Sequence, residues 1–333
     1  MSKVPVIDVH THSVSDAYIE AIKKYAGPEY TIKEVIGGQQ AVHRNGAPFM
    51  TLTPPMFDWD LRIKDMDKVG IDISIVSLTC PNVFWGGEEV SASIARMINK
   101  EFAAAQTQYP DRIRWYATLP WQYPNAAIAE LKTAVSEGAV GVVVLGNIAG
   151  KSLTDPQFAP VWEEIDKLGL PVQIHPTAPQ GMDEMDLLNY NLIASLGFMY
   201  DSSLALARMI FDGFFDRYRN LKIISLHGGA GLPFFIGRLD YCYEKMPACR
   251  VKISEKPSTY FLSDQIFIDA VVNFPETMDF IVKVKGADNV LYGTDYPHNI
   301  SDPEGILERV NGLRNPVTKK KILGLNAQRI FKL

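Results

Sequence analysis

Short apolar segments alternate with longer segments of helical periodicity along most of the chain. Several of the short segments are apolar at every position, which is typical of strands covered on both faces. The strand-like segments span residues 6–10, 73–78, 113–119, 139–145, 171–175, 221–227, 266–270 and 289–295. Because a segment long enough for a helix follows each strand, the pattern predicts an α/β protein of the (β/α)8 barrel type.

Three of the intervening segments carry clear helix signals. Residues 91–109 place apolar side chains at helical spacing. Residues 124–138 begin with Pro-Asn and end at Gly138, and residues 155–169 end in the same way at Gly169. A glycine directly after the last periodic residue is a typical helix stop, so these segments support the alternation of strands and helices.

Two segments interrupt the regular alternation. Residues 13–60 form a long insertion after the first strand, with "GGQQ", "HRNGAP" and "LTPPMFDWD" reading as loops around a few short elements. Residues 176–200 follow the fifth strand. Both come after the carboxyl ends of strands, the face where barrel enzymes keep their active sites. We therefore predict one distorted barrel domain over residues 1–333, with the insertion 13–60 near the active-site mouth.

Composition excludes several classes of protein. The chain of 333 residues is 47% hydrophobic and 21% charged, which is ordinary for a globular protein with a large core. Its formal net charge of −5 and the lack of long basic runs argue against nucleic-acid binding. Three cysteines without a C-x-x-C pair indicate a reducing compartment and no zinc–thiolate site. With neither a signal peptide nor a membrane span, we expect a soluble, cytoplasmic protein.

Metal-binding residue types stand at the ends of four predicted strands. They are His10 and His12 in "VIDVHTH", His175 in "PVQIHP", His227 in "KIISLHGG" and Asp295 in "VLYGTDYPH". The carboxyl ends of barrel strands meet at one mouth, so these side chains should converge there. Histidine and aspartate suit Zn²⁺ and similar divalent ions, and the sequence therefore predicts a metal site.

Neighbouring residues add detail to this prediction. His10 and His12 point to the same side of a regular strand, and we expect Asp8 to share that side one step deeper. There it would be a candidate to fix the orientation of the imidazoles. Gly228 and Gly229 either let the backbone approach the site closely or form a plain turn, and the residues alone do not decide between these interpretations.

The pattern resembles that of the amidohydrolase superfamily. Finer matches are "DLRIKDMDKVGID" (60–72), "HGGAGLPFFIGRLD" (227–240) and "GTDYPH" (293–298). Together they are similar to the branch that contains 2-amino-3-carboxymuconate-6-semialdehyde decarboxylase and the resorcylate-type decarboxylases, over about residues 5–333.

The resemblance implies roles for individual residues. One divalent metal would be bound by His10, His12, His175 and Asp295, with His227 off the metal as the acid/base and Asp295 also catalytic. Related decarboxylases replace the first histidine by glutamate and often use manganese, so both histidines here favour zinc, with manganese as the alternative. The fourth strand, "GVVVLGN", has no lysine that could bridge two metals, which favours a single ion.

A carboxylate substrate suits an arginine, because the guanidinium group pairs with it through two hydrogen bonds. The resemblance implies that Arg238 reaches the site of a neighbouring subunit in a homodimer, and the alternative is an ion pair with Asp240 or another acid. The second substrate-binding arginine of the similar decarboxylase falls on Met50 here. Either Arg44 takes its place through a different loop, or the protein acts on another acid. Arg62 is expected in a structural salt bridge.

Aromatic and apolar side chains near Met50 suit either a substrate ring or the core. They are Phe49, Met50, Met56, Phe57 and Trp59, and the same ambiguity applies to Phe84 and Trp85 after the second strand.

We therefore expect a metal-dependent, non-oxidative decarboxylase of an aromatic or conjugated unsaturated carboxylic acid. A hydrolase or hydratase of a small carboxylate would use the same metal-bound hydroxide and is the alternative. A catalytically silent scaffold is a further alternative, and the intact metal and base residues argue against it. The expected partners are a small carboxylate and a second copy of the chain, without nucleic acid or membrane.

Overall fold

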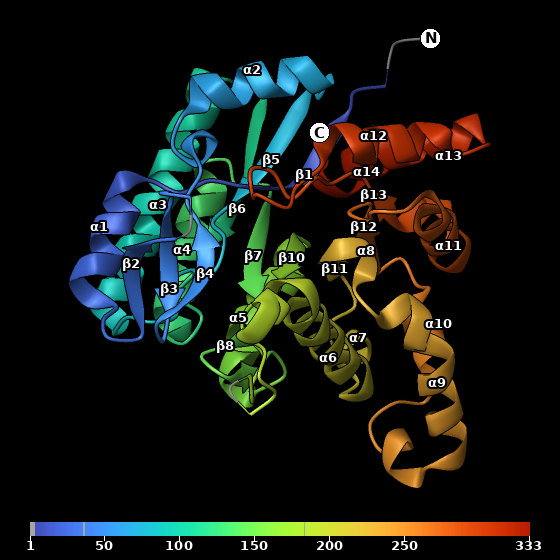
Figure 1. Ribbon diagram of the computed structural model, residues 1–333. Helices are drawn as coiled ribbons and strands as arrows, with labels where there is room; N and C mark the ends of the chain where they lie inside the picture. Colours follow the sequence, from blue (N-terminus) through green and yellow to red (C-terminus); the bar gives the residue numbers. More distant parts are fainter. Residues whose placement is uncertain (1–3, 36, 183) are drawn as a thin grey trace.

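The computed structural model of the protein describes residues 4–35, 37–182 and 184–333 (Figure 1). All eight predicted strands are present. They are β1 (Ile7–His12), β5 (Ile73–Ser77), β6 (Ile113–Thr118), β7 (Gly141–Leu145), β10 (Pro171–His175), β11 (Lys222–Ser225), β12 (Ile266–Asp269) and β13 (Val290–Leu291). These strands form one sheet in this order, and every adjacent pair is parallel.

The sheet closes into a barrel between its first and last strands. The backbone N–H of Val9 donates to the carbonyl of Tyr292 at 3.0 Å, and that of His12 donates to the carbonyl of Tyr296 at 2.7 Å. Thr11 and Tyr296 form a parallel bridge at the same seam. The predicted (β/α)8 barrel is therefore confirmed.

Apolar side chains of β1, β5, β6, β7, β11, β12 and β13, together with Leu226 directly after β11, form one cluster with the C-terminal helix α14 (Asn326–Phe331). Its buried members are Ile7, Val9, Ile75, Tyr116, Val143, Ile224, Leu226, Phe267, Leu291, Ala327, Ile330 and Phe331. Side chains from strands all around the sheet meet only inside a closed barrel, so this cluster fills the interior. The polar strand ends that follow it are left to form the site.

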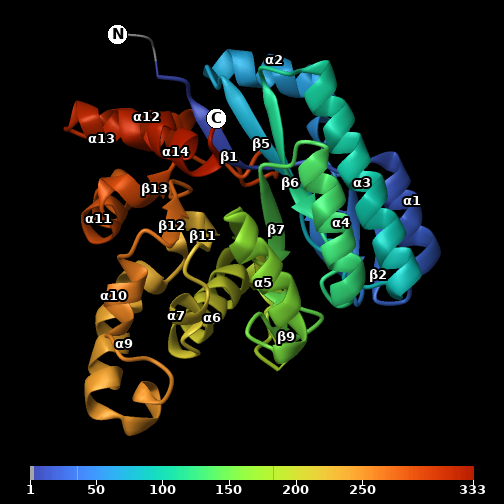
Figure 2. The same cartoon turned by 180° about the vertical axis from the view of Figure 1, so that it is seen from behind.

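The remaining helices surround the barrel. They are α2 (Trp59–Val69), α3 (Glu88–Gln108), α4 (Pro124–Ser136), α5 (Ala159–Leu168), α6 (Phe198–Phe211), α7 (Phe214–Arg217), α8 (Leu226–Gly229), α9 (Leu232–Lys245), α10 (Pro257–Phe261), α11 (Pro275–Lys285), α12 (Pro303–Gly312) and α13 (Pro316–Lys320). Helices α3 and α4 pack against β6 and against each other (Figure 2). The predicted stops at Gly138 and Gly169 are confirmed by their positive φ angles of 106° and 62°. None of the helices in the described ranges is long and apolar enough to cross a membrane.

The insertion 13–60 is more regular than the sequence indicated. It contains helix α1 (Asp16–Tyr25) and an antiparallel meander of β2 (Tyr30–Glu34), β3 (Gln40–Arg44) and β4 (Ala47–Thr51). Asn45 and Gly46, with φ angles of 49° and 86°, form the turn between β3 and β4. Asn-Gly is a strong hairpin signal, so the hairpin of β3 and β4 could have been predicted from "HRNGAP".

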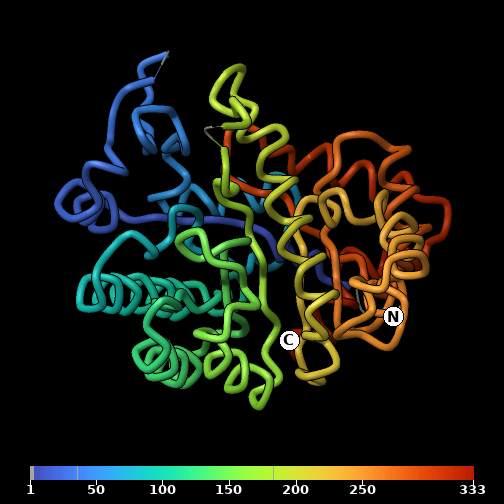
Figure 3. The backbone as a smooth tube through the Cα atoms, turned by 90° about the horizontal axis from the view of Figure 1, so that it is seen from below, coloured from blue at the N-terminus to red at the C-terminus, as the bar shows by residue number. Residues whose placement is uncertain are grey.

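The insertion lies beside the segment that follows β10. Phe49 packs against a small buried cluster of Ala178, Met182, Leu187 and Ile193. In Figure 3 the blue insertion and the yellow-green segment project from the same edge of the molecule. These two segments, which are far apart in the sequence, therefore build one rim.

Candidate metal centre

Four side chains that the sequence predicts as metal ligands converge at the ends of three strands. One donor atom of each of His10, His12, His175 and Asp295 lies within 4.8 Å of the others, and all four residues are buried. The Oδ1 atom of Asp295 is 3.1 Å from Nε2 of His10 and 3.2 Å from Nε2 of His12. The structure thus brings the whole predicted set together.

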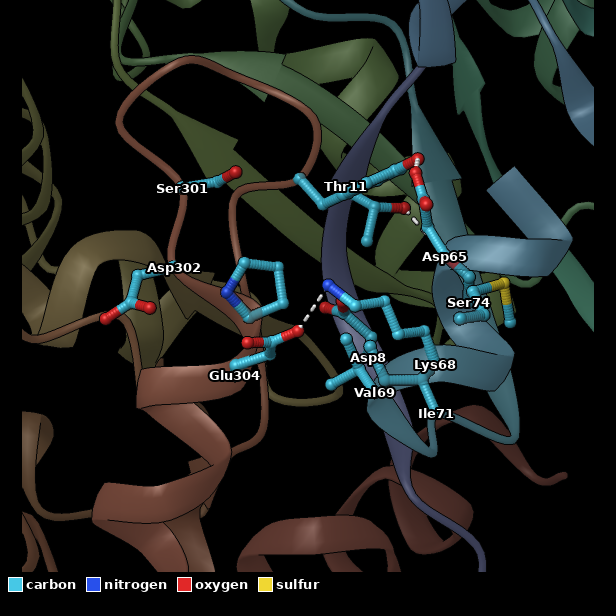
Figure 4. A pocket seen from close by; sticks show the side chains of 13 residues that line it. Asp8, Thr11, Asp65, Lys68, Val69, Ile71, Ser74, Ser301, Asp302 and Glu304 are labelled. Carbon is cyan, nitrogen blue, oxygen red and sulfur yellow. Dashed lines mark hydrogen bonds and ion pairs between the residues drawn. The ribbon is translucent and has the colours of Figure 1, made fainter. Parts of the chain in front are cut away.

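A β-bulge decides which side chains of β1 enter this centre. Asp8 pairs with Ser74 and Thr11 pairs with Val76, so β1 holds one residue more than β5 over this stretch. Asp8, Thr11 and Ser74 line a pocket of about 340 Å³ between β1, β5, α2 and residues 301–304 (Figure 4). The prediction that Asp8 lies beneath the two histidines is therefore wrong, because the regular alternation breaks at the bulge.

Asp8 supports the backbone instead of the imidazoles. Its carboxylate accepts hydrogen bonds from the backbone N–H of His10 at 3.1 Å and from the hydroxyl of Thr294 at 2.6 Å. Burial raises the pKa of Asp8 to about 7, although both hydrogen bonds oppose the shift. Asp8 thus ties the bulged part of β1 to the loop that carries Asp295.

Each histidine of the set has its Nδ1 atom engaged outside the centre, which leaves Nε2 for a ligand. The three contacts join His10 to Asp269 Oδ2 (2.7 Å), His12 to Ser77 Oγ (3.1 Å) and His175 to the carbonyl of Pro176 (2.8 Å). Partners of this kind fix the tautomer and the ring orientation of metal-binding histidines. The Nε2 atom of His10 is buried without a hydrogen-bond partner within the described chain. An orphaned donor atom facing a carboxylate fits a metal ion between them.

The charges around the centre also favour a cation. Burial opposes protonation of His10, but Asp295 and Asp269 outweigh it and raise the pKa of His10 to about 10. Burial lowers the pKa of His12 to about 3 and holds the pKa of His175 well below its ordinary value. Burial also acts to raise the pKa of Asp295, yet the positive charge at His10 outweighs it and keeps that carboxyl ionised. The carboxylates of Asp295 and Asp269 stabilise a proton on His10, and they would attract a divalent metal ion in the same way. The donor set therefore fits one such ion.

Asp269 is a functional residue that the sequence analysis missed. It is fully buried at the end of β12, and besides His10 it accepts a hydrogen bond from the backbone N–H of Gly228 at 2.7 Å. Its position at the end of the seventh strand was the available signal. It was overlooked because Asp269 contacts His10, one of the candidate metal-binding residues, and does not belong to that set itself.

His227 lies beside the four residues but outside their set. Its backbone is left-handed, with φ 54° and ψ 54°, and its Nε2 atom is 3.5 Å from Oδ2 of Asp295. Its Nδ1 atom is buried and has no partner among the described residues. Gly228 and Gly229 continue the turn with positive φ, and a Cβ atom at Gly229 would come within 2.7 Å of Ile268. These glycines therefore serve a close approach of the backbone to β12.

A cavity of about 590 Å³ opens onto the metal centre. Its polar lining includes His175, His227, Asp295 and His298, and its apolar lining includes Phe49, Met50, Phe198, Met199, Val271, Val272, Phe274 and Ile300. Within the described chain, this lining contains neither lysine nor arginine. Two of the apolar residues that the sequence left ambiguous, Phe49 and Met50, thus belong to the cavity wall.

The arginines lie elsewhere in the chain. Arg44 pairs with Glu29 at 3.1 Å and lines a separate pocket of about 250 Å³ that also includes Phe84 and Trp85. Arg238 is exposed on α9, and the part of the chain that the structure describes offers it no ion pair. The carboxylate of Asp240 accepts from the backbone N–H of Ser258 at 2.8 Å instead.

Arg62 does not form the expected salt bridge with any described residue. It is buried, its Nη2 atom donates to the carbonyl of His12, and its guanidinium carbon lies 4.9 Å from the ring centroid of Tyr296. Burial lowers the pKa of Arg62 to about 10. Arg62 therefore joins the end of β1 to the residue that follows Asp295.

A parallel barrel with three histidines and one aspartate at its strand ends defines a class of metal-dependent enzymes. The chain matches the family described as amidohydrolase over residues 7–333. The protein therefore belongs to the amidohydrolase family.

Three relatives place it more narrowly. It is 31% identical over 328 residues to the 2-amino-3-carboxymuconate-6-semialdehyde decarboxylase of Dictyostelium discoideum, which covers 96% of this chain and 90% of that protein. It is 32% identical over 288 residues to a gamma-resorcylate decarboxylase of a Rhizobium species, which covers 82% of this chain and 87% of that one. The crystal structure of 5-carboxyvanillate decarboxylase from Sphingomonas paucimobilis matches with a TM-score of 0.86 and 26% identity, covering 99% of this chain and 100% of that one. The resemblance noted from the sequence is confirmed.

Replacing Asp269 by asparagine should weaken zinc binding by about 10- to 100-fold, the usual effect of losing a charged partner behind a metal-binding histidine. Competition with a chromophoric chelator measures this affinity. Asp279→Asn, at an exposed position of α11, is the matched control. An unchanged zinc affinity in folded Asp269→Asn protein would show that Asp269 does not strengthen metal binding by His10.

Proposed function

We propose that this protein is a metal-dependent, non-oxidative decarboxylase of an aromatic or conjugated unsaturated carboxylic acid. The observation that carries the proposal is the buried set of His10, His12, His175 and Asp295 beside His227, at the head of a cavity with apolar walls. A cavity of about 590 Å³ is of the size that takes one small organic ligand. The relatives described above are decarboxylases, which supports this reaction.

The metal would be held by His10, His12, His175 and Asp295, and it would supply positive charge that orients a substrate oxygen and acidifies a bound water. We favour zinc over manganese because three imidazoles and one carboxylate are typical zinc ligands, whereas manganese prefers more oxygen ligands. Elemental analysis of protein purified without added metal distinguishes the two ions.

His227 is the residue that moves the proton. An imidazole can both donate and accept a proton, and the contact of Nε2 with Asp295 keeps this ring turned toward the centre. The proton is delivered to the carbon that bears the carboxylate, which interrupts the conjugation of the substrate. The carbon–carbon bond to the carboxylate then breaks, its electron pair restores the conjugation, and CO₂ leaves. Asp295 contributes to catalysis by holding His227 in place.

The walls of the cavity fit the non-reacting part of such a substrate. Phe49 and Met50 from the insertion face the cavity together with Phe198 and Phe274. Flat aromatic or conjugated groups bury their faces favourably against side chains of this kind. The insertion 13–60 therefore contributes directly to the site, in line with its proposed place at the active-site mouth.

We also propose that the protein works as a homodimer in which Arg238 enters the cavity of the partner subunit. Arg238 is exposed on α9, and no arginine or lysine of the described chain lines its own cavity. The same helix and the segment after it expose large apolar side chains, with Phe234 at 77%, Tyr241 at 58% and Val251 at 77% exposure. Apolar surface of this extent fits coverage by a second copy of the chain. Arg44 is the alternative carboxylate partner, if its loop moves toward the centre on binding.

A reducing compartment such as the cytoplasm is the proposed location. All three cysteines, Cys80, Cys242 and Cys249, are unpaired. Intracellular proteins keep thiols in this state.

The replacement His227→Ala should leave one metal ion per chain and lower CO₂ release by about 100-fold or more, the usual effect of losing a general acid or base. Elemental analysis and a CO₂ assay with a panel of hydroxybenzoic and unsaturated acids measure both effects. Metal loss in parallel with activity would make His227 a ligand. A hydrated or hydrolysed product from the wild-type protein, without CO₂, would favour the hydratase or hydrolase alternative.

Mixing two inactive variants tests the role of Arg238. His227→Ala chains combined with Arg238→Ala chains should recover about a quarter of the wild-type activity, because half of the dimers are mixed and each mixed dimer has one complete site. Activity is measured at substrate concentrations far below KM, where the loss of Arg238 weakens binding most. No recovery in dimers shown to be mixed would mean that Arg238 serves its own subunit or only the fold.

A further inference from the structure

His298 lines the cavity next to the metal centre but has no part in the proposed reaction. Its ring centroid lies 4.9 Å from that of His12. Its backbone N–H donates to the carbonyl of Asp295 at 3.1 Å, so both residues belong to one tight turn after β13. The backbone of His298 is therefore held beside the metal centre.

Thr79 holds the ring of His298 through one nitrogen. Thr79 is fully buried just after β5, and its hydroxyl oxygen lies 3.2 Å from Nε2 of His298. The other ring nitrogen, Nδ1, makes no hydrogen bond to any residue in the described ranges. One polar atom of a well-fixed ring is thus left unpaired in the cavity wall, and leaving such an atom unpaired beside a bound substrate is unfavourable.

The open position at Nδ1 suits a hydroxyl group, because one imidazole nitrogen gives or accepts a single hydrogen bond and a hydroxyl can do either. A carboxylate would be better served by a cationic donor.

We propose that His298 is a specificity-determining residue that binds a hydroxyl group on the substrate ring through Nδ1. This inference rests on the proposed function and narrows the substrate to a hydroxylated aromatic acid. The ring would lie between the apolar walls, with its carboxylate toward the metal centre and one hydroxyl toward the turn that carries His298. The hydroxyl then fills the hydrogen bond that Thr79 leaves open on the imidazole.

A comparison of two kinds of substrate shows whether His298 binds a substrate hydroxyl or only maintains the structure of the cavity. 2-Hydroxybenzoate, whose hydroxyl is next to the carboxylate and would lie with it toward the metal centre, is compared with the dihydroxybenzoates that carry a second hydroxyl at each other ring position. The wild-type protein should prefer one dihydroxy isomer by about 100-fold or more in kcat/KM, because a site built to bind a hydroxyl discriminates strongly against analogues that lack it. In His298→Phe, kcat/KM for that isomer should fall to about the value for 2-hydroxybenzoate, which itself changes little.

The pair Thr79→Ser and Thr79→Val provides a matched control. Serine keeps the hydroxyl that holds Nε2, so Thr79→Ser should keep the preference for the dihydroxy isomer. Valine has nearly the same shape without a hydroxyl, so Thr79→Val should lose most of the preference while KM rises more than kcat falls. This pair also decides the question if His298→Phe does not fold.

An equal loss for both kinds of substrate in His298→Phe, or an unchanged ratio, would overturn the assignment. If the zinc-loaded wild-type protein releases CO₂ from none of these acids, the proposed function fails instead. Calorimetric binding of the same acids to wild-type and His298→Phe protein then still tests His298, because the expected loss of the preference appears in the dissociation constants as well. Equal binding ratios in both proteins would reject the role.

Discussion

Three of the four residues of the candidate metal centre meet where the barrel closes, because they come from opposite ends of the chain. His10 and His12 end the first strand, whereas Asp295 follows the last one. The backbone N–H of Asp295 donates to the carbonyl of His10 at 2.8 Å, which puts the carboxylate next to both imidazoles. Arg62 reinforces the same seam from α2 by donating to the carbonyl of His12 and packing on Tyr296. Closure of the fold and assembly of the site are thus one event, and a bound metal should stabilise the closed barrel.

The arrangement places several ionisable groups where burial is unfavourable. Asp295 and Asp269 are both buried, and without a metal they share the positive charge of His10. Buried charges are tolerated when they are paired, and a divalent ion at the centre would neutralise these carboxylates. Buried charges of this kind are expected at functional sites, where residues needed for catalysis lower the local stability of the fold. The apolar cluster of Ile7, Val9 and their neighbours beneath the site supplies the stability that the centre lacks.

The fold and the convergence of the site residues were predictable because their signals are local and repeated. Each buried strand is a short apolar run, and the carboxyl ends of parallel strands must meet, so His10, His12, His175, His227 and Asp295 could be brought together from the sequence. The separation of His227 from the other four was implied by the resemblance to the amidohydrolase superfamily. The side of Asp8 was not predictable from alternation, because a single extra residue in β1 reverses it. Asp269 stands at the end of the seventh strand, but no residue pattern shows that its carboxylate contacts His10. In the same way, the sequence does not show that Thr79 contacts only one nitrogen of His298. Arg62 was expected in an ion pair because no sequence signal indicates that a backbone carbonyl can be its partner.

The central claim is that three imidazoles and one carboxylate of this barrel hold a single metal ion. X-ray absorption spectroscopy of the zinc-loaded protein tests it most directly, since it reports the number and type of ligand atoms at the metal. The account predicts only nitrogen and oxygen ligands at about 2.0–2.2 Å, with multiple-scattering features of three imidazoles. Cys80 lines the same cavity, so a sulfur ligand at about 2.3 Å is a specific alternative. A sulfur ligand, or fewer than three imidazoles, would contradict the account.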